Sequence, residues 1–178
     1  MARGADDWGM VQVYTGEGKG KTTAAIGLAV RAAGWGKRVK IIQFLKGRDT
    51  GELHSLAKLA PLVDVVQLGT GEFVLPGQER RGVEGATAWG LRLAEAVLAD
   101  ARYDLVILDE LMVALSLGLV TLEDVMALMR GKPDSVELVM TGRGAPPEVL
   151  AEADLVTHMC EEKHPFHDGI EARRGADY

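Results

Sequence analysis

The feature that most constrains this chain is a glycine-rich segment, Gly16-Glu17-Gly18-Lys19-Gly20-Lys21-Thr22-Thr23. It follows an alternating apolar run, Met10–Tyr14, and opens a helical run of small residues, Ala24–Ala33. A strand, a glycine-rich turn and a Lys-Thr pair at a helix start form the layout of a phosphate-binding loop. Because glycine lets the backbone turn tightly, several N–H groups and the helix N-terminus can face one polyanion. The pattern predicts that Lys21 reaches phosphate oxygens and that the Thr22 hydroxyl binds Mg²⁺.

The spacing of this loop departs from the usual pattern at one position. A glycine normally stands five residues before Gly20, where this chain has Thr15, and the first glycine is Gly16. We therefore expect a loop that is one residue tighter or differently shaped. A chance glycine-rich turn is the alternative, but the flanking strand and helix favour the phosphate loop.

Composition predicts one cytoplasmic domain, residues 1–178, with 1–9 as a ragged polar lead. The net charge of −6 argues against a nucleic-acid surface. No apolar run approaches the roughly 18 residues of a membrane span, and the N-terminus is too polar for a signal peptide. The single cysteine, Cys160, excludes an internal disulfide and suits a reducing compartment. We expect Cys160 to be a small buried hydrophobe.

Apolar runs bounded by turn residues predict six strands: Met10–Tyr14, Val39–Leu45, Val63–Leu68, Leu105–Leu108, Val136–Met140 and Leu155–Met159. Helical patterns lie between them: Lys21–Ala33, Glu52–Leu59, Glu79–Ala101, Leu122–Met129 and Pro146–Glu152. Most of the strand runs are continuous, as expected for strands covered on both faces.

This alternation predicts an α/β fold, with a mostly parallel central sheet and helices on both faces. Ligands of such sheets bind at the carboxyl ends of the strands. Thr121 is expected to cap its helix together with Asp124. Two segments are long and irregular, Thr70–Gln78 and Glu161–Tyr178, and loops of that length are usually functional.

A second chemical signal is the run Leu105–Leu108, which ends in two acids, Asp109 and Glu110. It predicts a strand that delivers carboxylates to the active edge, near the phosphate loop if the two strands are neighbours. Mg²⁺ takes oxygen ligands and usually keeps several waters, so one carboxylate, Thr22 and phosphate oxygens would suffice. The alternative is that both acids start the next helix, where they suit the helix dipole.

Two cations follow other strands at the same edge. Arg143 stands between two glycines, so it can approach a polyphosphate closely and bind it in a bidentate manner. Lys46 follows the second strand and would add positive charge. Taken singly, each cation is also explained as a solvated loop residue, and only their convergence favours a site.

The chain resembles the phosphate-loop type of ATP:corrinoid adenosyltransferases, from about Val11 to Tyr178. The matching segments are Tyr14–Ala25, Gln43-Phe44-Leu45-Lys46-Gly47, Leu108-Asp109-Glu110-Leu111, Thr141-Gly142-Arg143-Gly144 and the tail, with Lys163-His164-Pro165-Phe166 and Ala172–Tyr178. The family's loop has the same tight form, which accounts for Thr15. The resemblance implies a phosphate-loop NTPase architecture of the RecA-like kind.

The resemblance also implies the reaction: a Co(I) corrinoid attacks the 5′ carbon of ATP, and triphosphate leaves. ATP would lie on the loop, residues Gly16, Glu17, Gly18, Lys19, Gly20, Lys21, Thr22 and Thr23, with Lys46 nearby. The backbone amides of residues 18–21 would bind triphosphate. Lys21, Glu110 and Arg143 are the expected catalytic residues, and Thr22 and Glu110 the contacts of Mg²⁺ or Mn²⁺. The tail, residues 161–178, would contribute to the site. A homodimer and a reductase that supplies electrons are the implied partners.

Two departures from the family pattern concern the corrin face. Members commonly carry a Gly-Phe-Thr-Trp-like segment after the third strand, and here Gly69–Leu75 contains Phe73 but no tryptophan. We expect Phe73 to lie under the corrin ring, and the alternative is that it packs in the core beneath the loop. Some members also have a long N-terminal helix over the site, and the roughly nine residues before the first strand are too few for it. A more open site, or closure by a partner subunit, is expected instead.

Two other functions remain open from the residues alone. A small kinase or NTPase that acts on the γ-phosphate would use the same loop, acids and Arg143, although no arginine-rich lid segment is evident. A nucleotide-binding scaffold without catalysis is the other, and the intact Lys21, Thr22 and Glu110 argue against it. A γ-phosphate enzyme releases ADP, whereas the adenosyltransferase releases triphosphate.

Overall fold

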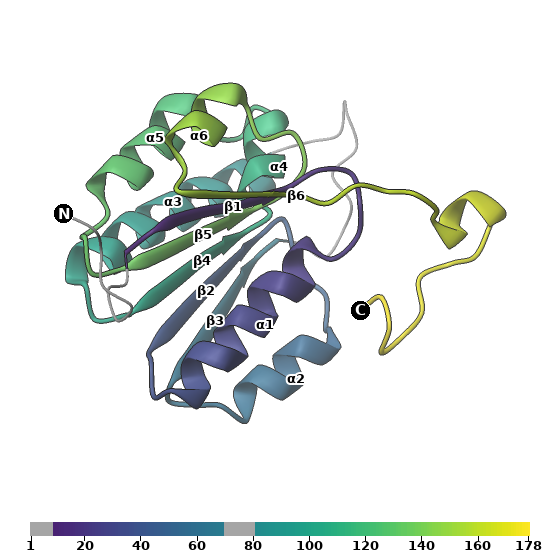
Figure 1. Cartoon of the computed structure of the whole chain (residues 1–178), viewed down its shortest axis with the longest axis horizontal. Helices are drawn as coiled ribbons and strands as arrows, with labels where there is room; N and C mark the ends of the chain where they lie inside the picture. The colour runs from purple at the N-terminus through teal and green to yellow at the C-terminus, as the bar shows by residue number, and fades with distance from the viewer. Residues whose placement is uncertain (1–8, 70–80) are drawn as a thin grey trace.

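The computed structural model describes residues 9–69 and 81–178, and it contains a six-stranded parallel sheet in the order β3-β2-β4-β5-β1-β6 (Figure 1). The strands are β1 (Val11–Thr15), β2 (Val39–Phe44), β3 (Val63–Leu68), β4 (Leu105–Asp109), β5 (Glu137–Thr141) and β6 (Leu155–His158). The helices are α1 (Lys21–Gly34), α2 (Gly51–Ala57), α3 (Arg81–Asp100), α4 (Leu111–Ser116), α5 (Leu122–Gly131) and α6 (Pro147–Glu152), followed by a 3₁₀ turn, η1 (Pro165–Asp168). The predicted α/β fold is confirmed.

Helices cover both faces of the sheet, as predicted. Figure 1 shows α1 and α2 on one face and α3, α4, α5 and α6 on the other. Two apolar clusters match these layers. One joins α1 and α2 to the sheet, through residues that include Ala25, Ala29, Leu56, Ile41 and Ile107. The larger one joins the other helices, through residues that include Leu98, Met112, Val125, Val149, Phe44 and Leu108. Burial of these side chains is the main stabilising contribution to such a layered fold.

The outermost strand departs from the expectation that the strands are covered on both faces. All residues of β2, β4 and β5 are buried, but every residue of β6 is exposed. Among the described strands β6 pairs with β1 alone, so it forms one edge of the sheet. The predicted run Leu155–Met159 contains Thr157 and His158, and these polar residues agree with a strand at an exposed edge.

The ends of the helices follow their capping chemistry. Thr121 and Asp124 form the predicted capping box at the start of α5, with 3.1 Å from the Asp124 N–H to the Thr121 hydroxyl oxygen. α3 ends at Asp100, one residue before the predicted end, and the predicted start at Glu79 lies outside the described residues. So does the predicted loop at residues 70–78. None of the helices in residues 9–69 and 81–178 has the length and apolar character needed to cross a membrane.

The sheet order corrects one assumption about the site. β1, which leads into the phosphate loop, and β4, which ends in the acids, are not neighbours, because β5 lies between them. The chain nevertheless brings the two together, since α1 crosses from the end of β1 and packs against β5, β4 and β2. The start of α1 therefore lies over the carboxyl end of β4.

Candidate functional site

The phosphate loop, residues 16–20, turns at two glycines with left-handed backbone geometry. Gly16 has φ 98° and Gly20 has φ 114°, values that side chains rarely allow. Gly18 is required for a different reason, because a Cβ atom there would lie 2.5 Å from the carbonyl oxygen of Cys160. The tight form of the loop thus depends on close contact with the chain that leaves β6.

Lys21 lies inside this loop. Its side chain is buried, and its ammonium donates hydrogen bonds to the carbonyl oxygens of Gly16 (2.6 Å) and Gly18 (2.7 Å). Burial and, next, the positive charge of Arg143 lower the pKa of Lys21, although the carboxylates of Glu110 and Glu17 oppose this. A cation that is partly desolvated in this way interacts strongly with an incoming phosphate.

One predicted phosphate donor is engaged elsewhere. The Gly18 N–H, counted from sequence among the phosphate-binding amides, donates to the carbonyl oxygen of Met159 at 2.7 Å. This bond ties the loop to the residues that follow β6. Thr23 is exposed on the first turn of α1, one residue past Thr22.

The Thr22 hydroxyl meets the acid at the end of β4. It donates to Oδ1 of Asp109 at 2.9 Å, and the Thr141 hydroxyl at the end of β5 donates to the same oxygen at 2.6 Å. Asp109 is almost completely buried. Three neighbouring segments therefore converge on one carboxylate, and this arrangement orients the Thr22 hydroxyl oxygen.

Lys46 approaches the same pair from the end of β2. Its ammonium lies 3.0 Å from the Thr22 hydroxyl oxygen and 2.8 Å from Oδ2 of Asp109. The Gln43 side-chain amide donates to that Oδ2 atom as well, at 3.1 Å. The structure places Lys46 at this edge of the sheet, in a direct ion pair with Asp109 that sequence reasoning did not anticipate.

Glu110 occupies a left-handed position between β4 and α4, with φ 63°. Its backbone N–H donates to the Thr141 hydroxyl at 3.0 Å. Burial, followed by the charge of Asp109, raises the pKa of the Glu110 carboxyl, whereas Lys46 and Lys21 oppose that shift. In the structure the carboxylate on Thr22 is that of Asp109, so a direct role of Glu110 at the metal remains a prediction.

Arg143 faces the phosphate loop from the turn after β5. Its guanidinium lies 3.2 Å from the Glu17 carboxylate, and both side chains are exposed. Gly142, just before it, has φ 135°, and a Cβ there would lie 2.8 Å from the backbone nitrogen of Val113. This turn is therefore packed closely on α4 and holds Arg143 beside the loop.

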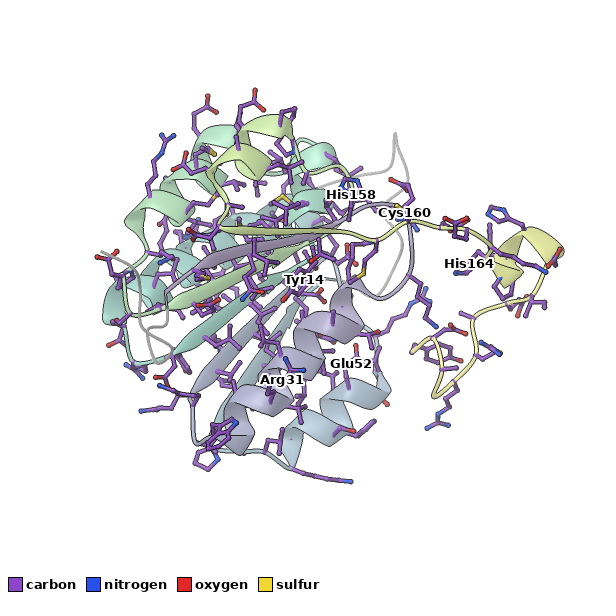
Figure 2. The ribbon with its side chains drawn as sticks, in the orientation of Figure 1. Tyr14, Arg31, Glu52, His158, Cys160 and His164 are labelled. Atoms are coloured by element: carbon purple, nitrogen blue, oxygen red, sulfur yellow. The ribbon has the colours of Figure 1, made fainter. Side chains whose placement is uncertain are left out.

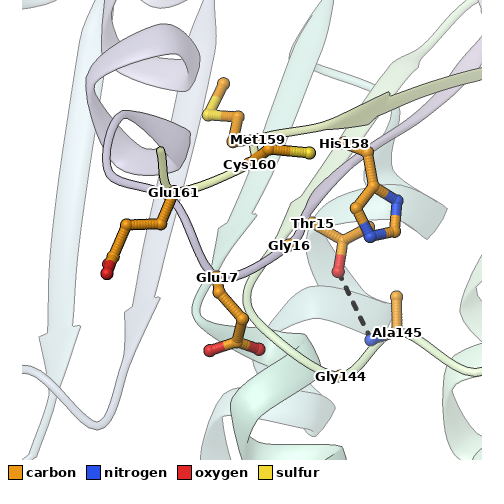
Figure 3. A pocket seen from close by; sticks show the side chains of 9 residues that line it. All are labelled: Thr15, Gly16, Glu17, Gly144, Ala145, His158, Met159, Cys160 and Glu161. Carbon is orange, nitrogen blue, oxygen red and sulfur yellow. Dashed lines mark hydrogen bonds between the residues drawn. The ribbon is translucent and has the colours of Figure 1, made fainter. Parts of the chain in front are cut away.

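An open pocket of about 400 Å³ lies on the β6 side of the loop (Figure 3). Its lining residues come from three strand ends: Thr15, Gly16, Glu17, Gly144, Ala145, His158, Met159, Cys160 and Glu161. Sequence reasoning did not select His158, Met159 or Cys160 for a site, and the one signal available was their position at the end of the last predicted strand. The prediction that Cys160 is buried is wrong: it is exposed at the end of β6, the outermost of the described strands on that side of the sheet (Figure 2).

The C-terminal tail returns to the phosphate loop after leaving the sheet (Figure 1). The Lys19 ammonium donates to the Ala176 carbonyl oxygen at 2.8 Å and forms an ion pair with Asp177. Asp177 also accepts a 2.9 Å hydrogen bond from the Arg173 N–H. The tail therefore contacts the loop, whereas Phe73, the residue expected at the corrin face, lies outside the described residues.

The oxygen donors at this edge suit a hard divalent cation. Thr22 supplies a hydroxyl, Asp109 and Glu110 supply carboxylates, and a cationic ammonium already lies between Thr22 and Asp109. Mg²⁺ is commonly bound by one or two carboxylates together with substrate phosphates. A Mg²⁺ ion held by Thr22 and a neighbouring carboxylate, completed by phosphate and water, is consistent with these residues.

Comparison with known proteins gives the family. Residues 7–178 match the family model described as ATP:corrinoid adenosyltransferase BtuR/CobO/CobP. The chain is 37% identical to a corrinoid adenosyltransferase of Pseudomonas aeruginosa, over 100% of this chain and 88% of that protein. It is 37% identical to a corrinoid adenosyltransferase of Escherichia coli K12 and 36% identical to corrinoid adenosyltransferase CobA of Salmonella typhimurium. Each of these two comparisons covers 100% of this chain and 90% of the relative.

Solved structures of low sequence identity share the fold. The flagellar accessory protein FlaH from Methanocaldococcus jannaschii superposes with a TM-score of 0.57 at 16% identity, covering 85% of this chain and 71% of that one. A KaiC-like protein from Pyrococcus horikoshii gives a TM-score of 0.58 at 17% identity, covering 88% and 75%. These likenesses support the predicted α/β fold. With the match over residues 7–178, the chain belongs to the ATP:corrinoid adenosyltransferase family.

Proposed function

We propose that this chain transfers the 5′-deoxyadenosyl group of ATP to the cobalt of a Co(I) corrinoid, in adenosylcobalamin synthesis or salvage. The cobalt electron pair forms the new cobalt–carbon bond, the C5′–O bond breaks, and triphosphate leaves with that bond's electrons. Since Co(I) is already a strong nucleophile, no general base is needed. One observation supports the proposal most strongly. In a member of this family, one edge of the sheet carries Lys21, the Thr22–Asp109 pair and Arg143.

The protein's contribution is to hold the triphosphate and to stabilise the charge that develops on it. Lys21 and the backbone amides of residues 19–21 would bind the phosphates, and preorganised donors of this kind contribute strongly to catalysis. Arg143 pairs with the Glu17 carboxylate, which the triphosphate would replace on that guanidinium. The protein would also hold C5′ in line with cobalt, and this orientation would contribute further to the rate enhancement.

A divalent cation, Mg²⁺ or Mn²⁺, would be held by Thr22 and Glu110, with Asp109 orienting the Thr22 hydroxyl. When bound, it would neutralise part of the triphosphate charge. Asp109 is better suited to positioning than to direct binding, because both of its oxygens already accept hydrogen bonds. Glu110, by contrast, has no side-chain hydrogen bond among the described residues, so its carboxylate remains available.

The remaining parts of the proposal concern the surroundings of the site. Phe73 would crowd the lower face of the corrin ring, which favours a cobalt of low coordination number. The tail would close over bound ATP through its contact with Lys19. We also propose a homodimer, a reductase that supplies electrons to cobalt, and a cytoplasmic location, since Co(I) requires a reducing environment.

Anaerobic turnover tests the proposed function. The full chain is incubated with ATP, Mg²⁺ and chemically reduced corrinoid, and the visible spectrum is followed while nucleotide products are separated. The expected result is a light-sensitive alkylcobalt spectrum together with triphosphate. ADP and orthophosphate as the products, with an unchanged corrinoid, would instead indicate a γ-phosphate enzyme.

A further inference from the structure

We propose that the ammonium group of Lys46 is a placeholder cation, which holds the Thr22 hydroxyl and the Asp109 carboxylate that orients it in position until a divalent cation displaces it. The group lies 3.0 Å from the Thr22 hydroxyl oxygen and 2.8 Å from Oδ2 of Asp109. It thus lies beside the hydroxyl oxygen proposed to bind the cation and beside the carboxylate that orients this hydroxyl. This inference rests on the proposed function only in assigning a divalent cation to the site.

The backbone directs Lys46 to this point. Leu45, directly before it, has φ 59°, an unusual value for a residue with a bulky side chain. The Leu45 N–H bonds to the Leu68 carbonyl oxygen at 3.0 Å. Gly69 packs against the turn so closely that a Cβ there would lie 2.8 Å from both Leu45 C and Lys46 N. Strained backbone conformations persist only where their surroundings enforce them, and here they aim Lys46 at the Thr22–Asp109 pair.

The two partners differ in their freedom to move. The Lys46 side chain keeps 25% of its surface exposed, whereas the Asp109 side chain keeps 2%. Asp109 is held by Gln43 and Thr141 as well, at 3.1 and 2.6 Å. The flexible lysine therefore has a path to solvent, and the acid does not. When the bridge opens, the ammonium leaves while the carboxylate keeps its position.

Charge balance explains why the bridge would be useful. Without a cation, Asp109 and Glu110 place two carboxyl groups at a mostly buried edge, and the charge of Lys46 compensates them. A divalent cation that enters with triphosphate restores the compensation and frees Lys46. The freed ammonium then lies beside the phosphates, so that metal and nucleotide bind together more readily than either binds alone.

Binding of Mn²⁺ to the nucleotide-free protein, measured by electron paramagnetic resonance, tests this inference. Lys46→Met removes the charge and keeps an unbranched side chain that is one atom shorter. If the bridge forms in about nine molecules of ten, its loss strengthens Mn²⁺ binding by about tenfold. In the presence of ATP the same substitution should weaken Mn²⁺ binding, since the ammonium no longer reaches the phosphates. A purely structural ion pair predicts unchanged or weaker Mn²⁺ binding in both conditions, and that result would overturn the inference.

Two further variants keep the test decisive. Lys58→Met makes the same change in net charge at an exposed lysine in the turn after α2, and it should leave Mn²⁺ binding unchanged. Lys46→Gln retains a donor toward Asp109, and it should show the stronger Mn²⁺ binding even if the methionine variant folds poorly. No corrinoid is present in these measurements. Failure of adenosyl transfer by the wild-type chain would therefore refute the proposed function and leave the Lys46 result standing.

Discussion

The Thr22 hydroxyl lies 2.9 Å from Oδ1 of Asp109, although the strands that lead to these two residues are separated by β5. Thr141, at the end of that intervening strand, donates to the same oxygen. The three segments are thus connected through one buried carboxylate. A nucleotide that binds at Thr22 therefore contacts a position fixed by the centre of the sheet, not by a surface loop.

Lys21→Ala should lower kcat by about a hundredfold. Loss of one preorganised donor to a developing anion typically costs about 3 kcal/mol of transition-state stabilisation. Steady-state turnover of ATP and reduced corrinoid measures the effect. Lys19→Ala, which removes a neighbouring cation that pairs with Asp177, should have a much smaller effect. If Lys21→Ala retained more than about a third of wild-type kcat, the main cation would be Lys19 or Arg143.

Glu110→Gln should weaken the apparent Mg²⁺ affinity more than Asp109→Asn does. The Glu110 carboxylate is the one proposed to bind the cation directly, whereas Asp109 positions Thr22. Titration of activity with Mg²⁺ separates the two variants. The reverse order, with unchanged Mg²⁺ affinity in Glu110→Gln, would assign the direct contact to Asp109.

Asp109→Asn should instead reduce stability. Both oxygens of this buried carboxylate accept hydrogen bonds, and such bonds to a charged group contribute about 1.5–3 kcal/mol each when they are well formed. Denaturant unfolding of the metal-free chain should show a loss within about that range. An unchanged unfolding midpoint would mean that the network around Asp109 adds little to the fold.

Gly18→Ala should lower ATP affinity and the melting temperature together. The added Cβ would lie 2.5 Å from the carbonyl oxygen of Cys160, so the loop must shift away from the end of β6. Gly27→Ala is the matched control, because a Cβ there would meet no atom of the described residues within 4 Å apart from the neighbouring backbone of its own helix. This control should keep its ATP affinity and gain up to about 1 kcal/mol of stability. If the two variants had the same ATP affinity and melting temperature, close packing of Gly18 against the end of β6 would be refuted.

Asp104 should contribute a pH-dependent part of the stability. Burial alone would raise its pKa, but the Arg38 backbone N–H and the Lys37 ammonium outweigh burial and bring it below the ordinary value of 3.8. A lowered folded-state pKa means that this stabilisation is complete above pH 3.8 and is lost as the pH falls through the folded-state value. The difference in unfolding free energy between wild type and Asp104→Asn should be constant from pH 5 to 7, roughly, and shrink in stronger acid. If the difference in unfolding free energy between the two proteins grew on acidification, it would contradict a lowered pKa of Asp104.

The strands and helices were largely predictable because each depends on local patterns of apolar and turn residues. Their order in the sheet was not, since pairing of distant strands leaves no local mark, and β5 between β1 and β4 was unforeseen. The sequence was enough to predict which segments form the site, but not which of their side chains contact each other. Which of the adjacent acids faces Thr22 depends on the left-handed backbone at Glu110, and the Lys46–Asp109 pair depends on the turn at Leu45. Neither conformation is specified by residue type alone.

The most direct test of the central claim follows the oxygen that bridges C5′ and the α-phosphorus of ATP. ATP labelled with ¹⁸O at that position is incubated anaerobically with the full chain, Mg²⁺ and reduced corrinoid, and the products are analysed by mass spectrometry. Attack by cobalt on C5′ breaks the C5′–O bond, so the account predicts that all of the label appears in triphosphate and that the corrinoid gains an unlabelled adenosyl group. Label retained in ADP or AMP would show that the bond broken lies among the phosphates, and it would contradict the account.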